Sequence, residues 1–218
     1  MTYPGADRFL PEKMRLSDLR RAAQACRGCD LYESATQVVF GAGLVKSRMM
    51  LVGEQPGDVE DRRGEPFVGP AGQVLDRALD AAEIERSDIY LTNAVKHFRW
   101  KATESTSRRL HATPSARQIA ACRPWLTGEL QAIRPTALVA LGSVASQSLF
   151  GAAFRLTQHR GEFLPWPPPT GPYADSQQSI DVVLATVHPS AVLRADDASR
   201  RETFDGLVRD LRQVVAAM

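Results

Sequence analysis

The stretch RMMLVGEQPG, residues 48–57, is the part of the sequence that decides the fold. Its first half is a short apolar run that stops at Gly53, which is typical of a strand buried on both faces. Its second half opens a loop rich in glycine and proline that continues to residue 72, where we expect no regular structure. A buried strand followed by such a loop is typical of a parallel α/β sheet, in which ligands bind beyond the carboxyl ends of the strands.

Strands and helices alternate outward from this stretch. Further strands are predicted from apolar runs at residues 89–95, 137–142 and 182–187. Helices are predicted from apolar periodicity at residues 16–27, 73–84, 114–133, 144–150 and 202–216. The alternation predicts one α/β domain over residues 1–218, with a mostly parallel central sheet and helices on both faces. We expect residues 1–15 to be a flexible N-terminal segment.

Length and composition narrow the class of protein. With 218 residues, of which 44% are hydrophobic, the chain can bury one sizeable core. The first thirty residues are rich in charge, and no apolar run approaches the roughly 20 residues that span a bilayer. We therefore expect a cytoplasmic protein with no membrane association. Nothing in the sequence indicates an obligate interface, so we expect a monomer.

Basic residues are concentrated in one part of the chain. The net charge is only +2, but seven Lys or Arg residues lie between Lys96 and Arg123 against a single acid, Glu104. The rest of the chain is therefore net acidic. A basic segment on an acidic protein indicates a ligand that carries phosphate, although an ordinary solvated surface is the alternative.

Polar residues follow three of the predicted strands at the point where each strand ends. They are Glu54, Gln55, Gly57 and Asp58 after the first strand, Asn93 at the end of the second and His188 after the last. Because the carboxyl ends of parallel strands share one edge of the sheet, we expect these residues to converge there. The long connection at residues 96–113 reads as neither helix nor strand, and such connections are usually functional or disordered. It contains His111.

Three cysteines favour metal or redox chemistry over a disulfide framework. Cys26 and Cys29 form a Cys-x-x-Cys pair, and Cys122 lies far from them in sequence. A tetrahedral zinc ion or a cubic iron–sulfur cluster needs a fourth ligand, for which His97, after the second strand, is the candidate. A free Cys-x-x-Cys pair on the surface with a buried Cys122 is the alternative.

The chain resembles the iron–sulfur uracil-DNA glycosylases of family 4 from about Cys26 to its end. The resemblance is carried by GEQPG (53–57), GEPFVGPAG (64–72), TNAVKH (92–97), CRPWL (122–126), TQHRGE (157–162) and TVHPSAVLR (186–194). More narrowly, the chain is similar to the X-type branch, UdgX, which attaches covalently to uracil-containing DNA through a histidine in an arginine-rich loop. Gln55 stands where family 4 usually has alanine, and His97 stands where family 4 has a cluster cysteine.

The inserted loop is the third feature of the X-type branch. Residues 107–111 read SRRLH, whereas the loop of the branch is typically KRRIH, so this chain differs at Ser107 and Leu110. The resemblance implies a structural four-iron cluster with ligands Cys26, Cys29, His97 and Cys122. It also implies that DNA containing uracil is the partner, with single-stranded DNA preferred.

Roles for the other residues follow from the chemistry of base excision. Asn93 offers one donor and one acceptor, which match the N3–H and O4 groups of uracil. Phe67 is suited to stack on an extruded base, and main-chain N–H groups from Gln55 to Asp58, through Gly57, are suited to bind O2. The alternatives are that Phe67 anchors its loop and that Asn93 caps a strand end.

The resemblance implies that His111 attacks C1′ of the deoxyribose. Glu54 is then expected to accept the other ring N–H of His111, and His188 to hydrogen-bond O2 as negative charge develops. The product, a neutral N-glycosyl imidazole, has no good leaving group, so the adduct should persist and limit the protein to one turnover.

Arg108, Arg109 and Ser190 are expected to hold phosphates. Two alternatives remain open at this point. One is a multiple-turnover hydrolase of family 4, and the other is a non-enzymatic metalloprotein that binds nucleic acid.

Overall fold

The computed structural model describes the backbone of residues 3–103 and 106–218, and the side chains of these residues except 103 and 106–108. Four strands form the central sheet in the order β2-β1-β5-β6, and all the described pairings between them are parallel. The strands are β1 (Met49–Gly53), β2 (Ile89–Asn93), β5 (Ala137–Leu141) and β6 (Val182–Thr186). The predicted α/β fold with a parallel central sheet is therefore confirmed.

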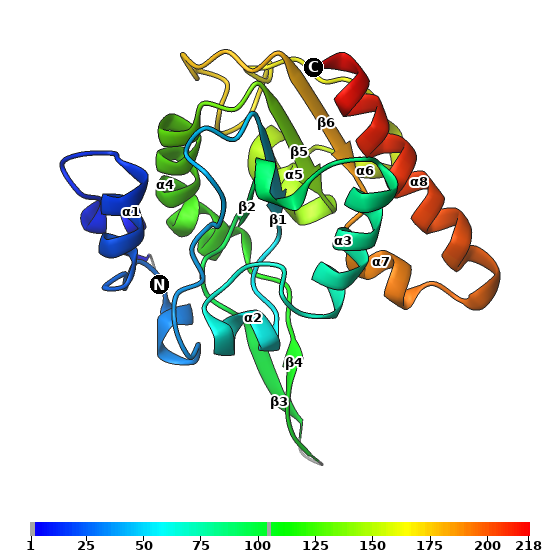
Figure 1. Ribbon diagram of the computed structural model, residues 1–218. Coiled ribbons are helices and arrows are strands. Elements are labelled where there is room, and N and C mark those ends of the chain that lie inside the picture. Colours follow the sequence, from blue (N-terminus) through cyan, green and yellow to red (C-terminus); the bar gives the residue numbers. More distant parts are fainter. Residues whose placement is uncertain (1–2, 104–105) are drawn as a thin grey trace.

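Helices cover both faces of this sheet, as predicted (Figure 1). Because side chains alternate along a strand, Met50 and Val52 of β1 enter one core whereas Met49 and Leu51 enter the other. The first core is covered by α1 (Leu16–Ala23), α4 (Ala116–Ile133) and α5 (Ser143–Phe150). The second is covered by α3 (Pro70–Ala81) and α8 (Asp197–Ala217). This double burial explains why the strands are predominantly apolar on both faces.

The loop predicted for residues 53–72 is wrong in part, because it contains the short helix α2 (Asp58–Arg63). Gly57 is the N-cap, and its N–H donates to the carboxylate of Glu60 in the first turn. Gly64 ends the helix with a left-handed φ of 74°. The glycines that suggested an irregular loop therefore begin and end a helix.

The prediction that residues 96–113 lack regular structure is also wrong. This segment forms an antiparallel hairpin of β3 (Trp100–Thr103) and β4 (Thr106–His111), which projects from the body beyond the end of the sheet (Figure 1). Trp100 pairs with His111, and Ala102 pairs with Arg109. Paired residues share a face of a hairpin, so Arg109 and His111 lie on the same side as Trp100. Leu110 lies on the other face and is exposed.

The remaining differences concern the ends of elements. The helix predicted for residues 16–27 ends at Ala23, so Cys26 and Cys29 lie in the connection to the 3-10 helix η2 (Asp30–Glu33). The other short helices are η1 (Ala6–Phe9), η3 (Arg86–Asp88), α6 (Leu156–His159) and α7 (Pro189–Arg194).

The described part of the N-terminal segment packs against the body of the protein. The N–H of Gly5 donates to the carbonyl of Gly28 at 3.0 Å, and Ala6 is fully buried. None of the helices in the described ranges is both long and apolar enough to cross a bilayer.

Candidate active site

The predicted site residues gather where β1, β2 and β6 end. Glu54 follows β1 directly, Asn93 is the last residue of β2, and His188 is the N-cap of α7 just after β6. The β3–β4 hairpin brings His111 to the same edge, 3.5 Å from the Glu54 carboxylate. Three parallel strands and one hairpin thus supply the polar groups of this edge.

Gly53 allows Asn93 and Phe67 to meet. A Cβ atom added at Gly53 would collide with Oδ1 of Asn93 and would lie 2.7 Å from Cζ of Phe67. Both side chains are buried, with 3% of Asn93 and 5% of Phe67 exposed. An amide and an aromatic ring therefore share the space left by the missing side chain.

Phe67 has an unusual backbone conformation for an aromatic residue. Its φ is +56°, in the left-handed region that bulky residues rarely adopt. Arg86 holds this turn by donating from Nη2 to the Phe67 carbonyl at 3.0 Å. The ring of Phe67 lies over the ring of His188, with centroids 6.1 Å apart and planes inclined by 30°. Strained conformations of this kind cluster at functional sites.

The His188 ring is held in a neutral form that can donate a hydrogen bond from Nε2. Its Nδ1 accepts a hydrogen bond from the main-chain N–H of Ser190 at 3.1 Å, so the ring proton is on Nε2. The Ser190 hydroxyl lies 2.7 Å from the same Nδ1, and it accepts from Nη1 of Arg194 at 2.8 Å. Burial lowers the pKa of His188 to about 4, with further lowering by Arg194 and His111. The ring can therefore donate from Nε2 without carrying charge at neutral pH.

Glu54 has an unsatisfied buried oxygen. Among the described residues, its Oε1 has no hydrogen-bond partner, although it lies 3.5 Å from Nε2 of His111. Burial raises the pKa of Glu54 to about 7, against an opposing effect of Arg194. Burial also lowers the pKa of His111, and Arg194 lowers it further. Near neutral pH the site thus holds a neutral imidazole beside a carboxyl group close to its midpoint.

The side chain of Gln55 fastens the base of the hairpin to the sheet edge. Its Oε1 accepts from the N–H of Arg99 at 2.9 Å, and its Nε2 donates to the carbonyls of Ala112 at 3.0 Å and Arg99 at 3.2 Å. The Gln55 amide nitrogen also lies 2.9 Å from Nε2 of His111, so its two N–H groups are shared among three neighbouring acceptors. Sequence reasoning assigned only the main chain of Gln55 to the site, and the structure adds this contact between side chains.

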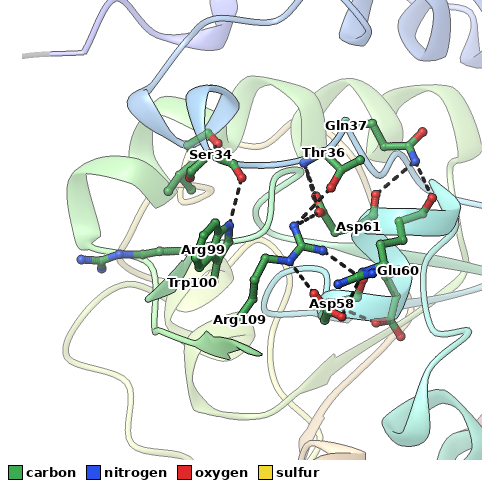
Figure 2. Close-up of polar contacts among 12 residues, drawn as sticks. Ser34, Thr36, Gln37, Asp58, Glu60, Asp61, Arg99, Trp100 and Arg109 are labelled. Atoms are coloured by element: carbon green, nitrogen blue, oxygen red, sulfur yellow. Dashed lines mark hydrogen bonds and ion pairs between the residues drawn. The ribbon is translucent and has the colours of Figure 1, made fainter. Parts of the chain in front are cut away.

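Arg109 is enclosed by carboxylates and aromatic rings. Its Nε lies 2.5 Å from Asp58 Oδ1, and its Nη1 lies 2.6 Å from Asp61 Oδ2, as Figure 2 shows. The guanidinium also lies over the rings of Phe98 and Trp100, 5.4 and 5.6 Å from their centroids. Only 12% of the side chain is exposed. Its observed contacts hold the hairpin against α2, and the predicted phosphate contact of Arg109 stays a prediction.

Residues 34–36 connect the hairpin to α2 through two further hydrogen bonds. The carboxylate of Asp61, which is fully buried, accepts from the N–H of Thr36 at 3.0 Å (Figure 2). Trp100 donates from Nε1 to the carbonyl of Ser34 at 2.9 Å. The side chain of Arg108, predicted to bind phosphate, lies outside the described residues.

Glu60 organises the loop after β1. Its carboxylate accepts from the N–H of Gly57 at 3.2 Å and from the N–H of Gly69 at 2.8 Å. The N–H of Gly57 is therefore used within the protein in this structure, and the predicted role of Gly57 toward a base stays a prediction. The predicted roles of the main-chain N–H groups of Gln55 and Asp58 stay predictions.

The predicted metal ligands are buried, and the three thiols belong to one core. Cys26 accepts from Nε1 of Trp125 at 3.2 Å, and Cys122 accepts from the N–H of Lys96 at 3.3 Å. Burial raises the pKa of Cys29 to about 11 and of Cys122 to about 12. Over residues 3–103 and 106–218, no three His, Cys, Asp or Glu side chains approach closely enough to hold one metal ion.

Several residues near the site were missed by sequence reasoning. They are Glu60, Asp61, Lys96, Phe98, Trp100, Glu129 and Arg194. The acids that follow GEQPG were a usable signal, because acids in a first helical turn favour a helix start. No local pattern identifies the partners of Lys96 or Arg194.

Comparison with known proteins places this geometry in a family. Residues 40–212 match the family described as the uracil DNA glycosylase superfamily. The chain is similar to the type-4 uracil-DNA glycosylase of Pyrobaculum aerophilum, with 33% identity over 183 residues that cover 83% of this chain and 86% of the relative. The enzyme of the same name from Thermotoga maritima is 35% identical over 170 residues, or 78% of each chain.

A third relative is matched over a shorter region. The type-4 uracil-DNA glycosylase of Archaeoglobus fulgidus is 38% identical over 135 residues, which cover 62% of this chain and 63% of the relative, so that match spans less than two thirds of its length. The family match covers most of the chain, including every predicted site residue except Cys26 and Cys29. This chain therefore belongs to the uracil-DNA glycosylase superfamily.

Proposed function

We propose that the protein excises uracil from DNA and remains covalently linked to C1′ of the deoxyribose through His111, in a single turnover, as in the X-type branch (UdgX). One observation carries this proposal: the imidazole of His111 reaches the sheet edge and lies 3.5 Å from a buried Glu54 oxygen that lacks a hydrogen-bond partner in the described chain. An imidazole beside a carboxyl group that can take its proton is an activated nucleophile.

Recognition of uracil would use the pair of side chains above Gly53. The Asn93 amide can accept from N3–H and donate to O4, and Phe67 can stack on the extruded base. The crowding of both side chains against Gly53 supports this proposal, because it limits how either one can move. The main-chain N–H groups of Gln55 and Asp58 are proposed donors to O2.

Departure of the base would be assisted by His188. As the bond from C1′ to N1 breaks, its electron pair stays with uracil, and negative charge spreads to O2. The Nε2–H of His188 is a suitable donor, because Ser190 occupies Nδ1 and the pKa of the buried ring, about 4, keeps it neutral. A neutral donor stabilises the anion without protonating it fully.

Capture of the sugar would use one ring nitrogen of His111. Its lone pair forms the new bond to C1′, and the resulting imidazolium then loses its remaining N–H proton, for which Glu54 is the proposed acceptor. In the resting structure the Gln55 amide lies 2.9 Å from Nε2, so attack through Nε2 requires this contact to break. Glu54 lies beside Nε2 in this structure, so attack by Nε2, which leaves the proton on Nδ1, also requires the ring to turn and bring Nδ1 to Glu54. The neutral product has no good leaving group, which accounts for a lasting adduct.

The proposed four-iron cluster would be held by Cys26, Cys29, His97 and Cys122. The donor set fits such a group, because the three thiols are buried in one core and two of them accept N–H hydrogen bonds, as cluster sulfurs do. A cluster of several irons would not require these side chains to meet around one ion. When bound, the cluster would supply structural support by joining the segment after α1 to α4.

Binding of DNA is proposed to involve Arg108 and Ser190, with single-stranded DNA preferred and the protein acting as a cytoplasmic monomer. For Arg109 we propose mainly a positioning role, because Asp58 and Asp61 already pair with its guanidinium. Arg109 would then hold His111 at the sheet edge while Arg108 contacts phosphate.

A single experiment tests the proposal. A single-stranded oligonucleotide with one uracil is incubated with excess protein and separated on a denaturing gel. We expect a band of protein joined to DNA that survives hot detergent, and no such band with His111→Ala. The same band with His111→Ala would overturn the covalent role of His111.

The second candidate is a multiple-turnover hydrolase, which the names of the type-4 relatives favour. Release of uracil well beyond one equivalent per protein, with no joined band, would support it. Recovery of intact oligonucleotide would instead indicate a protein that binds nucleic acid without acting on it.

A further inference from the structure

Lys96 and Glu129 form an ion pair that is completely buried. Nζ of Lys96 lies 2.5 Å from Oε2 of Glu129, and both side chains are 0% exposed. Burying two charges requires removing both from water, and an apolar pair of similar volume is often as stable or more stable. Stability of the fold alone is therefore a weak reason for this pair, and its other contacts indicate a second role.

At one end of the pair, Lys96 holds the strand that carries Asn93. Nζ donates to the main-chain carbonyl of Asn93 at 2.7 Å and to Oγ1 of Thr92 at 2.7 Å. With Glu129, these contacts use all three donors of the ammonium group. The side chain thus folds back across the turn after β2 and closes it.

At the other end, Glu129 is fixed by rigid elements. It belongs to α4, and its carboxylate accepts from the Tyr90 hydroxyl at 2.9 Å, the Thr92 hydroxyl at 2.9 Å and the N–H of Gly41 at 3.1 Å. A carboxylate held by this many donors has little freedom to move. Lys96 is consequently anchored to a helix and to β2 at the same time.

The position of Asn93 matters because its surroundings are tight. Its Oδ1 would collide with any side chain at Gly53, and the ring of Phe67 closes the same space. A shift of the main chain at Asn93 would therefore move the amide out of register with a base. We propose that Lys96, fixed by Glu129, is a positioning residue that holds Asn93 for uracil recognition.

This inference depends on the proposed function, and its test keeps the two separate. The variant Lys96→Met/Glu129→Leu replaces the ion pair by apolar side chains of similar volume, so folding should be retained. The stability should be lower, because the donors of Tyr90, Thr92 and Gly41 lose their acceptor. Excision of uracil is measured in a single turnover with saturating protein. We expect a rate about 10- to 100-fold below that of the unmodified protein, because small misplacements of a binding group have effects of this size.

Two further readouts distinguish positioning from a purely structural role. Inhibition by free uracil should weaken about 10-fold, whereas affinity for undamaged single-stranded DNA should be unchanged, since the side chain of Lys96 is completely buried. Iron content and the melting curve are measured on every variant, and rates are compared at equal iron content because the Lys96 N–H bonds Cys122.

Tyr90→Phe is the matched control. It removes the hydrogen bond from Tyr90 to the Glu129 carboxylate but keeps the hydrogen bond from Lys96 to the Asn93 carbonyl. It should therefore lower the melting temperature without slowing excision. Where the double variant does not fold, Lys96→Gln/Glu129→Gln replaces the charges by a neutral amide pair, and the same slower excision is expected from it.

A folded double variant that excises uracil at the unmodified rate would overturn the positioning role and leave the proposed function intact. An unmodified protein that releases no uracil would overturn the proposed function itself.

Discussion

The side-chain amide nitrogen of Gln55, which carries only hydrogens, faces Nε2 of His111 across 2.9 Å. The orientation of the amide follows from its other contact, because Oε1 accepts from the N–H of Arg99 and Nε2 must then face the imidazole. The Nε2 atom of His111 is therefore unprotonated in this arrangement, and the ring proton is on Nδ1. The lone pair that could attack a sugar is present but occupied.

Replacing Gln55 by Ala should affect the adduct more than uracil release. The substitution removes the contact to His111 and the bonds that fasten the hairpin through Arg99 and Ala112. We expect the rate of adduct formation to fall about 10-fold, the effect of losing one or two net hydrogen bonds, while uracil is still released. Uracil release and the joined band on a denaturing gel are measured together. Lys101→Ala, on the exposed part of the same hairpin, is the control.

The pH dependence of adduct formation should follow Glu54. The proposed proton acceptor must be ionised, and burial raises its pKa to about 7. Adduct formation should thus be slow below pH 6, rise through about pH 7 and level off above it. Rates of single-turnover capture measured from pH 5 to 9 check this expectation, and Glu54→Gln should remove the rise as well as slowing capture. A profile unchanged by Glu54→Gln would assign the proton acceptor elsewhere.

The raised pKa of Glu54 should also affect stability, which is expected to fall as pH rises, whereas adduct formation is expected to increase. Folded Glu54 keeps its proton up to about pH 7, whereas an unfolded glutamate loses it near pH 4.3. The folded state then binds more protons between these values, so the free energy of unfolding should decrease as pH rises through this window. Glu54→Gln should flatten that decrease in urea unfolding curves.

Arg108 and Arg109 should respond differently to substitution. Arg109→Ala leaves the buried Asp61 without its cation, which we expect to destabilise the protein by about 3 kcal/mol in urea unfolding. Arg108→Ala should reduce the salt dependence of binding to single-stranded DNA by about 0.7 in the log–log slope. If Arg109→Ala instead changed the salt slope without changing stability, the phosphate contact would belong to Arg109.

Gly53→Ala should impair uracil excision through crowding. The added Cβ would meet Asn93 Oδ1 and the Phe67 ring, so one of these side chains must move. We expect single-turnover excision to slow by about 100-fold. Gly161→Ala is the matched control, because φ at Gly161 is +73° and the variant should be destabilised while Asn93 is untouched. Equal slowing in both variants would attribute the effect to stability alone.

Ser190→Ala tests the arrangement around His188. The Ser190 hydroxyl lies between His188 Nδ1 and Arg194, but the main-chain N–H of Ser190 still fixes the tautomer without it. Uracil release should therefore slow only about 10-fold, as expected for one polar contact. His188→Ala, which removes the donor itself, should slow release by about 100-fold or more, because donors that stabilise developing charge are worth this much. Both rates are measured with one uracil oligonucleotide.

The sequence by itself determined the sheet, its cores and the edge at which the site lies. Apolar runs such as residues 49–53 identify buried strands because only a strand covered on both faces is apolar throughout. The carboxyl ends of those strands then had to bring Glu54, Asn93 and His188 together. Motif resemblance added His111, and membership of the uracil-DNA glycosylase superfamily is confirmed by the match over residues 40–212.

Only the tertiary structure decided which partner each polar side chain takes. The contacts of Gln55 with His111, of Arg109 with Asp61 and of Lys96 with Glu129 join residues 56, 48 and 33 positions apart. Local pattern describes which face a residue occupies, but a hydrogen bond depends on distance and direction between side chains on different elements. The hairpin that presents His111 could not be predicted from the sequence for the same reason. Its strands lack a simple apolar alternation, because Arg109 pairs with Asp58 of α2 and Trp100 hydrogen-bonds to Ser34.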